Sequence, residues 1–321
     1  MKNFTAMNTS FLLAGLNDAN TVRVKELIDQ AENTCSRFLA DSEVSVVNTN
    51  KGLWVPVSPL TYRLLADAWQ AYQHTASIFN PFLGSTLEQF GYNRSFELLP
   101  QDLSAAGVED KHCNFSTEIN RSECKPYLTF DPKTSSVRLD SEAELDLGGI
   151  AKGWIAQYAA EQCMLHGVDH GLIDAGGDIV LWGKEPDQQA WGVEVAHPLQ
   201  ADRQIADLWI EGLTAIATSN IIKRSWVGPA GKRVHHIIDP RTGHPVQSDL
   251  IQATVLTRDL TLSEQYTKVL LVLGAQAGIA WLTDHCPAAA CIVVQTDGTI
   301  ATSGNLDLYC TEWEVFHHAY N

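Results

Sequence analysis

The feature that most limits the possible folds is the irregular order in which helical and strand patterns follow one another. Residues 21–39 and 58–76 carry apolar side chains at helical spacing, and Ser58 stands where an N-cap is expected. Such mixing favours an α+β fold of mixed sheets with packed helices over a doubly wound parallel sheet. Further helices are predicted at 149–166, 262–273 and 275–284, and strands at 127–130, 135–139, 170–182, 191–195, 205–218, 233–238, 251–256 and, closing the fold, 290–295.

The composition describes an acidic chain with enough apolar residues for a large core. The sequence has 321 residues, 45% hydrophobic and 19% charged, so we expect one domain over 1–321 with a polar insertion at about 94–126. Lysine and arginine number 22 against 38 aspartates and glutamates, which gives a net charge of −16. This charge argues against nucleic acid or an anionic membrane as a partner.

Targeting and cysteine patterns predict a cytoplasmic chain. The apolar run at 11–16 is too short for an export signal, and no stretch approaches the roughly 20 apolar residues of a membrane span. Seven cysteines occur without a Cys-x-x-Cys pair, which favours free thiols in a reducing compartment. A disulfide between Cys113 and Cys124 is the alternative.

One segment combines the end of a strand, two glycines and the start of a helix. It runs from Glu144 to Trp154 and reads ELDLGGIAKGW. Helix starts expose unpaired N–H groups and the positive end of the dipole, and Lys152 in the first turn could reach the same anion. The spacing of a Walker A loop is absent. Ordinary packing of helix against strand is the other interpretation.

A second glycine-rich segment places two carboxylates around a turn. It reads IDAGGDIVLWG from Ile173 to Gly183, with Asp174 and Asp178 flanking Ala-Gly-Gly. Two interpretations fit the pattern equally well: a plain hairpin or bulge, and a backbone that is exposed to a ligand between two carboxylates.

The densest basic stretch leads into a turn. Residues 223–226 (KRSW) and 231–234 (GKRV) carry four basic side chains, and HHIIDPRTG follows from His235 to Gly243. Asp-Pro-x-x-Gly predicts a turn that closes a strand and orients what precedes it. The basic residues fit a solvated hairpin tip as well as a phosphate-facing surface.

Taken in order, these segments resemble the FAD:protein FMN transferases of the ApbE family. The resemblance rests on LDLGGIAKG, DAGGD, ATS (217–219) and HIIDPRTG, and it covers about residues 5–275. Met-Asn-Thr at 7–9 is similar to the family's Met-Gly-Thr, and DSEVSVVN at 41–48 and IFNPFLG at 78–84 are similar to two further family segments.

The resemblance implies a T-fold-like α+β core and an enzyme that binds FAD and Mg²⁺. Such an enzyme transfers FMN to a threonine or serine hydroxyl of an acceptor flavoprotein, a subunit of an electron-transfer complex, and releases AMP. His236 would lie beside the reacting phosphate and assist the hydroxyl, since a histidine titrates near neutrality; a purely structural His236 is the alternative. The residues implied to contact FAD are Met7, Phe38, Ile78, Phe79, Asn80, Asp146, Lys152 and Ile237.

The implied metal site departs from the family pattern. The family has Asp-x-x-x-Thr on the helix that here reads LSEQYTKVLLVLG, and alignment places Glu264 and Lys268 at these positions. Gly149, Glu264 and Thr267 are the implied metal residues, although Thr267 falls one residue early, about 100° around the helix. Lysine cannot ligate a cation, and Glu264 and Lys268 have the favourable order for an ion pair in the metal's place.

Two smaller departures weaken the match to the family pattern. Asn80 occupies a position where the family has an aspartate, and Asn220 occupies one where a glycine is usual. The alternatives to an active transferase are therefore a family member that binds FAD without transferring FMN, and an FAD pyrophosphatase. A dehydrogenase is disfavoured because no Gly-x-Gly-x-x-Gly follows a strand.

Overall fold

An antiparallel sheet of eight strands is the largest element of the computed structural model, which describes residues 1–100, 127–140, 142–185, 189–200, 202–229 and 231–316. The chain divides into two compact units. Unit 1 comprises Met1–Gln30, Gly149–Lys223 and Gln247–Asn321, and unit 2 comprises Ala31–Gly148 and Arg224–Val246. Each unit is thus assembled from segments that are distant in the sequence.

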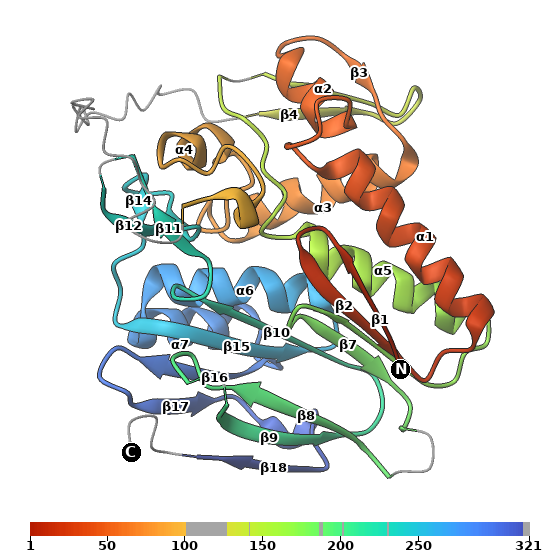
Figure 1. Ribbon diagram of the computed structural model, residues 1–321, viewed down its shortest axis with the longest axis vertical. Helices are drawn as coiled ribbons and strands as arrows, with labels where there is room; N and C mark the ends of the chain where they lie inside the picture. Colours follow the sequence, from red (N-terminus) through yellow and green to blue (C-terminus); the bar gives the residue numbers. More distant parts are fainter. Residues whose placement is uncertain (101–126, 141, 186–188, 201, 230, 317–321) are drawn as a thin grey trace. The chain divides into compact units, whose positions relative to one another are not determined.

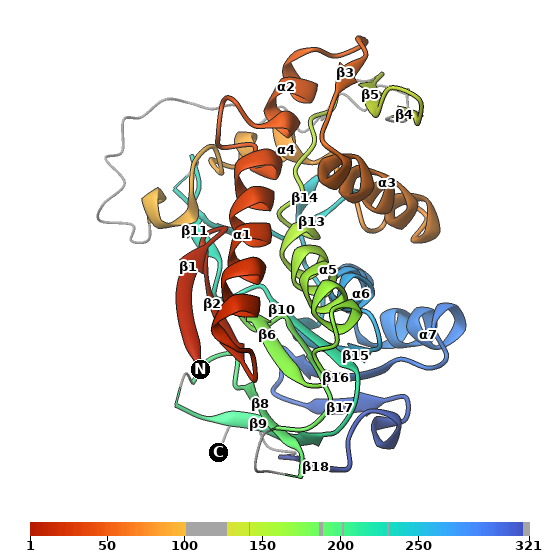
Figure 2. The same ribbon diagram turned by 90° about the vertical axis from the view of Figure 1, so that its right-hand side faces the viewer.

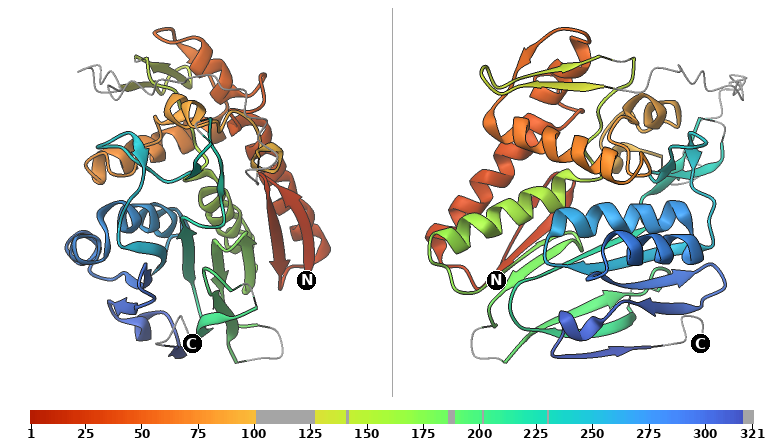
Figure 3. Two further views of the ribbon diagram at one scale, coloured as in Figure 1. Left: turned by 60° about the vertical axis from the view of Figure 1, so that its left-hand side comes forward. Right: turned by 180° about the vertical axis from the view of Figure 1, so that it is seen from behind.

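Unit 1 is built in layers around this sheet. Helices α5 (Ala151–Leu165) and α6 (Leu260–Leu273) cover one face, and a three-stranded sheet of β8 (Trp191–Ala196), β9 (Gln204–Ile210) and β18 (Glu312–Val315) packs on the other (Figure 1). Helix α7 (Ala275–His285) lies beside α6 (Figure 3), and η2 is a short turn at Leu306–Leu308. In order across the large sheet, the strands are β1 (Lys2–Ala6), β2 (Thr9–Ala14), β6 (Gly171–Ala175), β7 (Ile179–Trp182), β10 (Thr214–Asn220), β15 (Leu250–Thr257), β16 (Ala290–Gln295) and β17 (Ile300–Ser303).

Burial along the strands explains the layering. Every residue of β15 is buried, as expected for a central strand with both faces covered. Trp191, Leu181 and Ile292 come from three different strands and belong to the apolar core between the two sheets. The face toward the helices carries the polar residues described below.

Helix α1 (Asp18–Cys35) begins in unit 1 and ends in unit 2. Its first half lies along the β1–β2 hairpin (Figure 2). The Lys25 ammonium lies 5.7 Å from the centroid of the Phe4 ring of this hairpin.

Unit 2 is smaller and consists of short elements. Its helices are α2 (Glu43–Thr49), α3 (Pro59–His74), α4 (Gly84–Gln89) and the 3₁₀ turn η1 (Phe96–Leu98). Trp226, which is fully buried, donates its indole N–H to the Phe90 carbonyl at 2.8 Å and joins two distant segments in one core. The strands pair as β3 (Val55–Pro56), β5 (Ser136–Leu139) and β4 (Leu128–Asp131); β11 (Ser225–Val227) with β12 (Arg233–His235); and β13 (Ile238–Asp239) with β14 (His244–Pro245).

The fold confirms the predicted α+β class, and the predicted helices α3, α5, α6 and α7 occur within two residues of their expected bounds. Some expectations were wrong in detail. The helix predicted at 21–39 spans 18–35. The strands predicted at 170–182 and 205–218 are each two strands, because Gly176, Gly177 and Gly212 turn the chain at φ of 74°, 96° and 83°. Strand β16 does not close the fold, since β17 and β18 follow it.

The single-domain organisation over 1–321 stays a prediction. Most of the insertion expected at 94–126, with Cys113 and Cys124, lies outside the described residues, which include only 94–100 of it.

Candidate functional site

Three of the sequence segments meet in unit 1 around a group of four charged side chains. Lys152 lies in the first turn of α5, Asp178 at the β6–β7 turn, and Glu264 and Lys268 on α6. We call these four residues the charged cluster. The Lys152 ammonium lies 2.5 Å from Glu264 Oε1 and 3.1 Å from Asp178 Oδ2, and the Lys268 ammonium lies 3.1 Å from Glu264 Oε1. The ion pair expected between Glu264 and Lys268 is therefore present.

Local structure explains why Glu264 lies at the centre of the cluster. The Asp259 side chain caps α6 by accepting from the N–H of Thr261 at 2.7 Å, which fixes where the helix begins. Glu264 is fully buried, and its Oε2 accepts the Gly153 N–H at 2.8 Å. A Cβ on Gly153 would lie 2.7 Å from that oxygen, so only glycine lets the start of α5 approach the carboxylate so closely.

A fourth sequence segment, ATS at 217–219, contacts the cluster through β10. Asp178 Oδ1 accepts the N–H of Thr218 at 3.3 Å, so this aspartate is held by the ATS segment on one side and by Lys152 on the other. Asp174 stabilises the tight turn by accepting the Gly177 N–H at 2.6 Å. The turn is thus a hairpin, and it also places one carboxylate in the charged cluster.

The pKa values follow from burial and from the two lysines. Burial alone would raise the pKa of Glu264, but the ammonium groups of Lys152 and Lys268 lower it to about 2. Burial, with the neighbouring Glu264 carboxylate, raises the pKa of Asp178 against the lowering effect of Lys152 and Lys268. Burial also lowers the pKa of Lys268, whereas the Glu264 carboxylate raises it. Two ammonium groups and two carboxylates balance in formal charge.

The residues that the resemblance assigns to magnesium do not fit a divalent cation. Both Glu264 oxygens already accept from ammonium or N–H groups. The buried Thr267 hydroxyl donates to the Glu264 carbonyl at 2.8 Å and contacts Ser219 Oγ at 2.7 Å. Gly149 is a half-buried turn residue before α5. Across the described ranges, no group of three or more His, Cys, Asp or Glu side chains is placed to hold a metal.

Met7 lies in unit 1 at the tip of the β1–β2 hairpin. Met7 and Asn8 have φ of 50° and 55°, which residues other than glycine rarely adopt and which suit a two-residue hairpin turn. Backbone strain of this kind is found at ligand-binding positions, so the geometry is compatible with the role that the resemblance implies.

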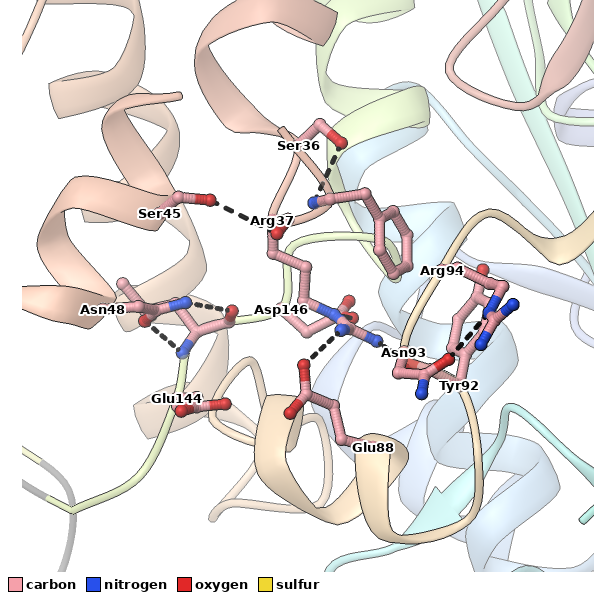
Figure 4. Close-up of polar contacts among 12 residues, drawn as sticks. Ser36, Arg37, Ser45, Asn48, Glu88, Tyr92, Asn93, Arg94, Glu144 and Asp146 are labelled. Atoms are coloured by element: carbon pink, nitrogen blue, oxygen red, sulfur yellow. Dashed lines mark hydrogen bonds and ion pairs between the residues drawn. The ribbon is translucent and has the colours of Figure 1, made fainter. Parts of the chain in front are cut away.

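Unit 2 contains a second polar group, centred on Arg37 (Figure 4). The Arg37 side chain is 7% exposed, and its guanidinium lies 2.5 Å from Asp146 Oδ2 and 3.1 Å from Glu88 Oε1. It also donates to the Tyr92 carbonyl at 2.5 Å, and the Phe38 ring centroid lies 4.3 Å from the guanidinium carbon. We call these five residues the arginine cluster.

In unit 2, hydrogen bonds from two other segments hold the backbone of residues 145–146, which precedes Gly148 and Gly149. Asn48 both donates to the Leu145 carbonyl, at 2.9 Å, and accepts the Leu145 N–H, at 2.8 Å. The Asp146 N–H donates to the Pro81 carbonyl at 2.8 Å, and its Oδ1 accepts the Gly148 N–H at 2.8 Å. Asp146 is therefore rigidly placed and ion-paired with Arg37.

The segment after α3 forms a compact loop. Ala76 and Ser77 have φ of 49° and 71°, and the buried Thr75 hydroxyl accepts the Phe79 N–H at 3.0 Å. Asn80 Oδ1 accepts the Phe82 N–H at 2.8 Å, the turn contact that an aspartate would also make. Asparagine here keeps the loop geometry and loses one negative charge. Ile78 is half-buried beside it.

His236 lies between β12 and β13. The His236 Nδ1 contacts the Arg224 carbonyl at 3.3 Å, so the neutral ring donates from Nδ1 and carries its lone pair on Nε2. Ile237 is buried. The turn predicted from Asp-Pro-x-x-Gly is present, because the Gly243 N–H donates to the Asp239 carbonyl at 2.7 Å, and β13 pairs with β14.

The structure brings some predicted site residues together and adds others. In unit 1, Lys152, Glu264 and Thr267 are neighbours, and in unit 2 Phe38 and Asp146 meet through Arg37. Arg37 and Tyr92 were missed, and so was the pairing of Asp178 with Lys152. A buried arginine signals a carboxylate partner, but the partner lies 109 residues away in sequence.

The structure is an α+β fold in which an antiparallel sheet carries helices on one face. Three of the motifs on which the family resemblance rests meet on this face of the sheet. The model of the ApbE family matches residues 7–293, and the chain belongs to this family. The resemblance drawn from the motifs is thereby confirmed.

Relatives and solved structures of the family align with most of the chain. A protein from Klebsiella pneumoniae named FAD:protein FMN transferase is 29% identical over 89% of this chain and 85% of its own length. One of the same name from Vibrio cholerae is 26% identical over 88% and 82%. The crystal structure of the ApbE protein from Thermotoga maritima superposes with a TM-score of 0.78 at 25% identity, over 97% of this chain and 99% of that one.

Proposed function

We propose that this protein transfers FMN from FAD to a threonine or serine hydroxyl of an acceptor protein and releases AMP. The observation that carries the proposal is the family match over 7–293, which includes both clusters and His236. The two relatives described above are named FAD:protein FMN transferase, which supports the transfer of FMN from FAD to a protein.

The chemistry needs a hydroxyl to attack the phosphorus on the FMN side of the diphosphate. A new oxygen–phosphorus bond forms, the bond from this phosphorus to the bridging oxygen breaks, and AMP leaves with the electron pair. His236 is proposed to accept the hydroxyl proton at Nε2, because Nδ1 already donates to Arg224. Phosphoryl transfer depends mostly on positioning and on charge neutralisation, which buried lysines can provide.

The remaining roles follow the resemblance. Met7, Phe38, the Ile78–Asn80 backbone, Asp146, Lys152 and Ile237 are proposed to contact FAD. The magnesium ion that the resemblance implies at Gly149, Glu264 and Thr267 is not part of the proposal, because the Glu264 oxygens and the Thr267 hydroxyl are already bonded.

The proposed acceptor is a flavoprotein subunit of an electron-transfer complex, and the proposed location is the cytoplasm. Cys35, Cys163, Cys286, Cys291 and Cys310 are free thiols, which supports a reducing compartment. No helix within the described ranges is long and apolar enough to cross a membrane.

Mass spectrometry of an acceptor peptide tests the proposal directly. The protein is incubated with FAD and a peptide bearing the acceptor threonine, and we expect the peptide to gain one FMN while AMP appears in equal amount. His236→Gln should lower the rate by about 100-fold or more, as for loss of a general base. His244→Gln is the matched control, because His244 is an exposed histidine of the same segment and should leave the rate unchanged.

The outcomes separate the alternatives. An unmodified peptide with intact bound FAD would favour a member that only binds FAD. Free FMN and AMP without peptide modification would favour a pyrophosphatase.

A further inference from the structure

The charged cluster of unit 1 presents its cations outward and its carboxylates inward. The side chains of Lys152 and Lys268 are each 12% exposed, whereas those of Glu264 and Asp178 are 0% and 6% exposed. An anion that approaches this group therefore meets ammonium groups first.

Glu264 holds the two lysines in a fixed arrangement. Its Oε1 contacts both ammonium groups, and its Oε2 is anchored by the Gly153 N–H at the start of α5. An ammonium group has three protons, so the ion pair of Lys268 with Glu264 Oε1 does not exhaust the capacity of Lys268 to donate, whereas Lys152 is paired with both Glu264 and Asp178. The α5 N-terminus adds a positive helix end, which its own N-cap residue Ile150 does not cap and which Glu264 contacts only at the Gly153 N–H.

Lys268 also lies where a metal bound to Glu264 would have to sit. A magnesium ion binds carboxylate oxygen at about 2.0–2.1 Å and keeps near-octahedral geometry. The Lys268 ammonium is 3.1 Å from Glu264 Oε1, and the Lys152 ammonium is 2.5 Å from the same oxygen. A divalent cation at this oxygen would face two positive charges at close range.

We infer that Lys268, together with Lys152, takes the place of a divalent cation in this protein and binds the diphosphate of FAD through ammonium groups alone. This inference rests on the proposed function, because it concerns the same substrate. It assigns Glu264 and Asp178 the role of positioning residues, which hold the lysines and do not ligate metal.

Equilibrium binding of FAD, followed by quenching of flavin fluorescence, tests the inference without an acceptor. In the wild type, we expect the same dissociation constant in excess EDTA and in excess Mg²⁺. Lys268→Met should weaken binding in EDTA by about tenfold or more, the usual scale for a lost charge-assisted contact. Lys268→Arg keeps the charge and should retain most of the affinity.

Lys184→Met is the matched control for the loss of one positive charge. Lys184 pairs with Glu211 at 3.0 Å on the surface of the same unit, and both side chains are about half exposed. Its substitution should leave the dissociation constant unchanged within about twofold, because exposed charges are screened.

A metal readout gives an independent test. Mn²⁺ titration followed by electron paramagnetic resonance should show no tight site in the wild type. Glu264→Asp with Lys268→Thr should create a Mn²⁺ site and make FAD binding depend on the metal. If a variant fails to fold, as judged by circular dichroism, the wild-type titrations with EDTA, Mg²⁺ and Mn²⁺ still decide.

Two results would overturn the inference: FAD binding by the wild type that requires Mg²⁺, or a Lys268→Met variant that binds FAD as the wild type does in EDTA. Metal-independent FAD binding that Lys268→Met weakens supports the inference even if no peptide is modified, and then only the transferase proposal fails. A protein that binds no FAD contradicts both.

Discussion

At the scale of single residues, Arg37 shows how one buried side chain orders its surroundings. Its planar guanidinium donates to Asp146, Glu88 and the Tyr92 carbonyl (Figure 4). The Phe38 ring centroid lies 4.3 Å from the guanidinium carbon. A guanidinium has five donors in a fixed fork, whereas a lysine ammonium is a compact point charge. The role of Arg37 is therefore geometric as well as electrostatic.

Replacing Arg37 with lysine should keep the charge and lose the geometry. We expect Arg37→Lys to lower the free energy of unfolding by about 1–3 kcal/mol, because buried acceptors around Asp146 lose charged donors. Urea denaturation measures the loss. Arg63→Lys is the control, since Arg63 and Asp67 form an exposed pair with 4.0 Å between Nε and Oδ2, and its cost should stay below about 0.5 kcal/mol. Equal costs for the two variants would contradict the proposed ordering role.

At the scale of elements, helices were better predicted than hairpins. Periodicity located α3 and α6, and Ser58 supplied a local N-terminal signal for α3; the Asp259 cap of α6 was not predicted. The β1–β2 hairpin was missed because its turn uses Met7 and Asn8 at positive φ instead of a recognisable glycine pair. The sequence located the helix of Glu264 and its ion pair with Lys268, but the contacts to Lys152 and Gly153 depend on how α5 and α6 pack.

The cap of α6 offers a test at this scale. The Asp259 carboxylate accepts from the N–H groups of Thr261 and Leu262, so Asp259→Ala leaves two donors without this partner. We expect the free energy of unfolding to fall by about 0.5–2 kcal/mol. Asp284→Ala, an exposed position near the end of α7, should change it by less than about 0.5 kcal/mol. Thermal unfolding of both variants provides the comparison, and an unaffected Asp259→Ala would show that this cap contributes little.

At the scale of the whole molecule, strand pairing is where sequence analysis reached its limit. In the large sheet β2 pairs with β6, and β7 pairs with β10, which brings residues 9–14 beside residues 171–175. Periodicity identifies a strand but not its distant partner, and nothing local indicates how the strands of the described residues divide among their sheets. The motifs nevertheless predicted the family, because their order along the chain is preserved whatever the pairing.

At the same scale, we expect His235 to make the free energy of unfolding depend on pH. The ring is held in its neutral form, because Nδ1 accepts the Ile237 N–H at 3.3 Å and Nε2 donates to the Val246 carbonyl at 3.2 Å. Burial lowers the pKa of His235 below its ordinary value of 6.5, against the raising effect of the Val246 carbonyl. In the unfolded chain the ring takes up a proton at about pH 6.5.

The sign follows from proton linkage. Above pH 6.5 the ring is neutral in both the folded and the unfolded state, and the full stabilisation from the neutral ring is present. Between pH 6.5 and the lower pKa of the folded state, only the unfolded chain binds the proton. Stability should therefore fall on acidification through this window, by at most about 1.4 kcal/mol per pH unit from this group.

His235→Gln keeps a donor for Val246 but cannot titrate, so its curve of unfolding free energy against pH should be flatter between pH 6.5 and the lower native pKa than that of the wild type. His244→Gln, at an exposed position, should follow the wild-type curve. Parallel curves for His235→Gln and the wild type, from denaturant titrations between pH 5 and 8, would mean that other groups cause the acid sensitivity.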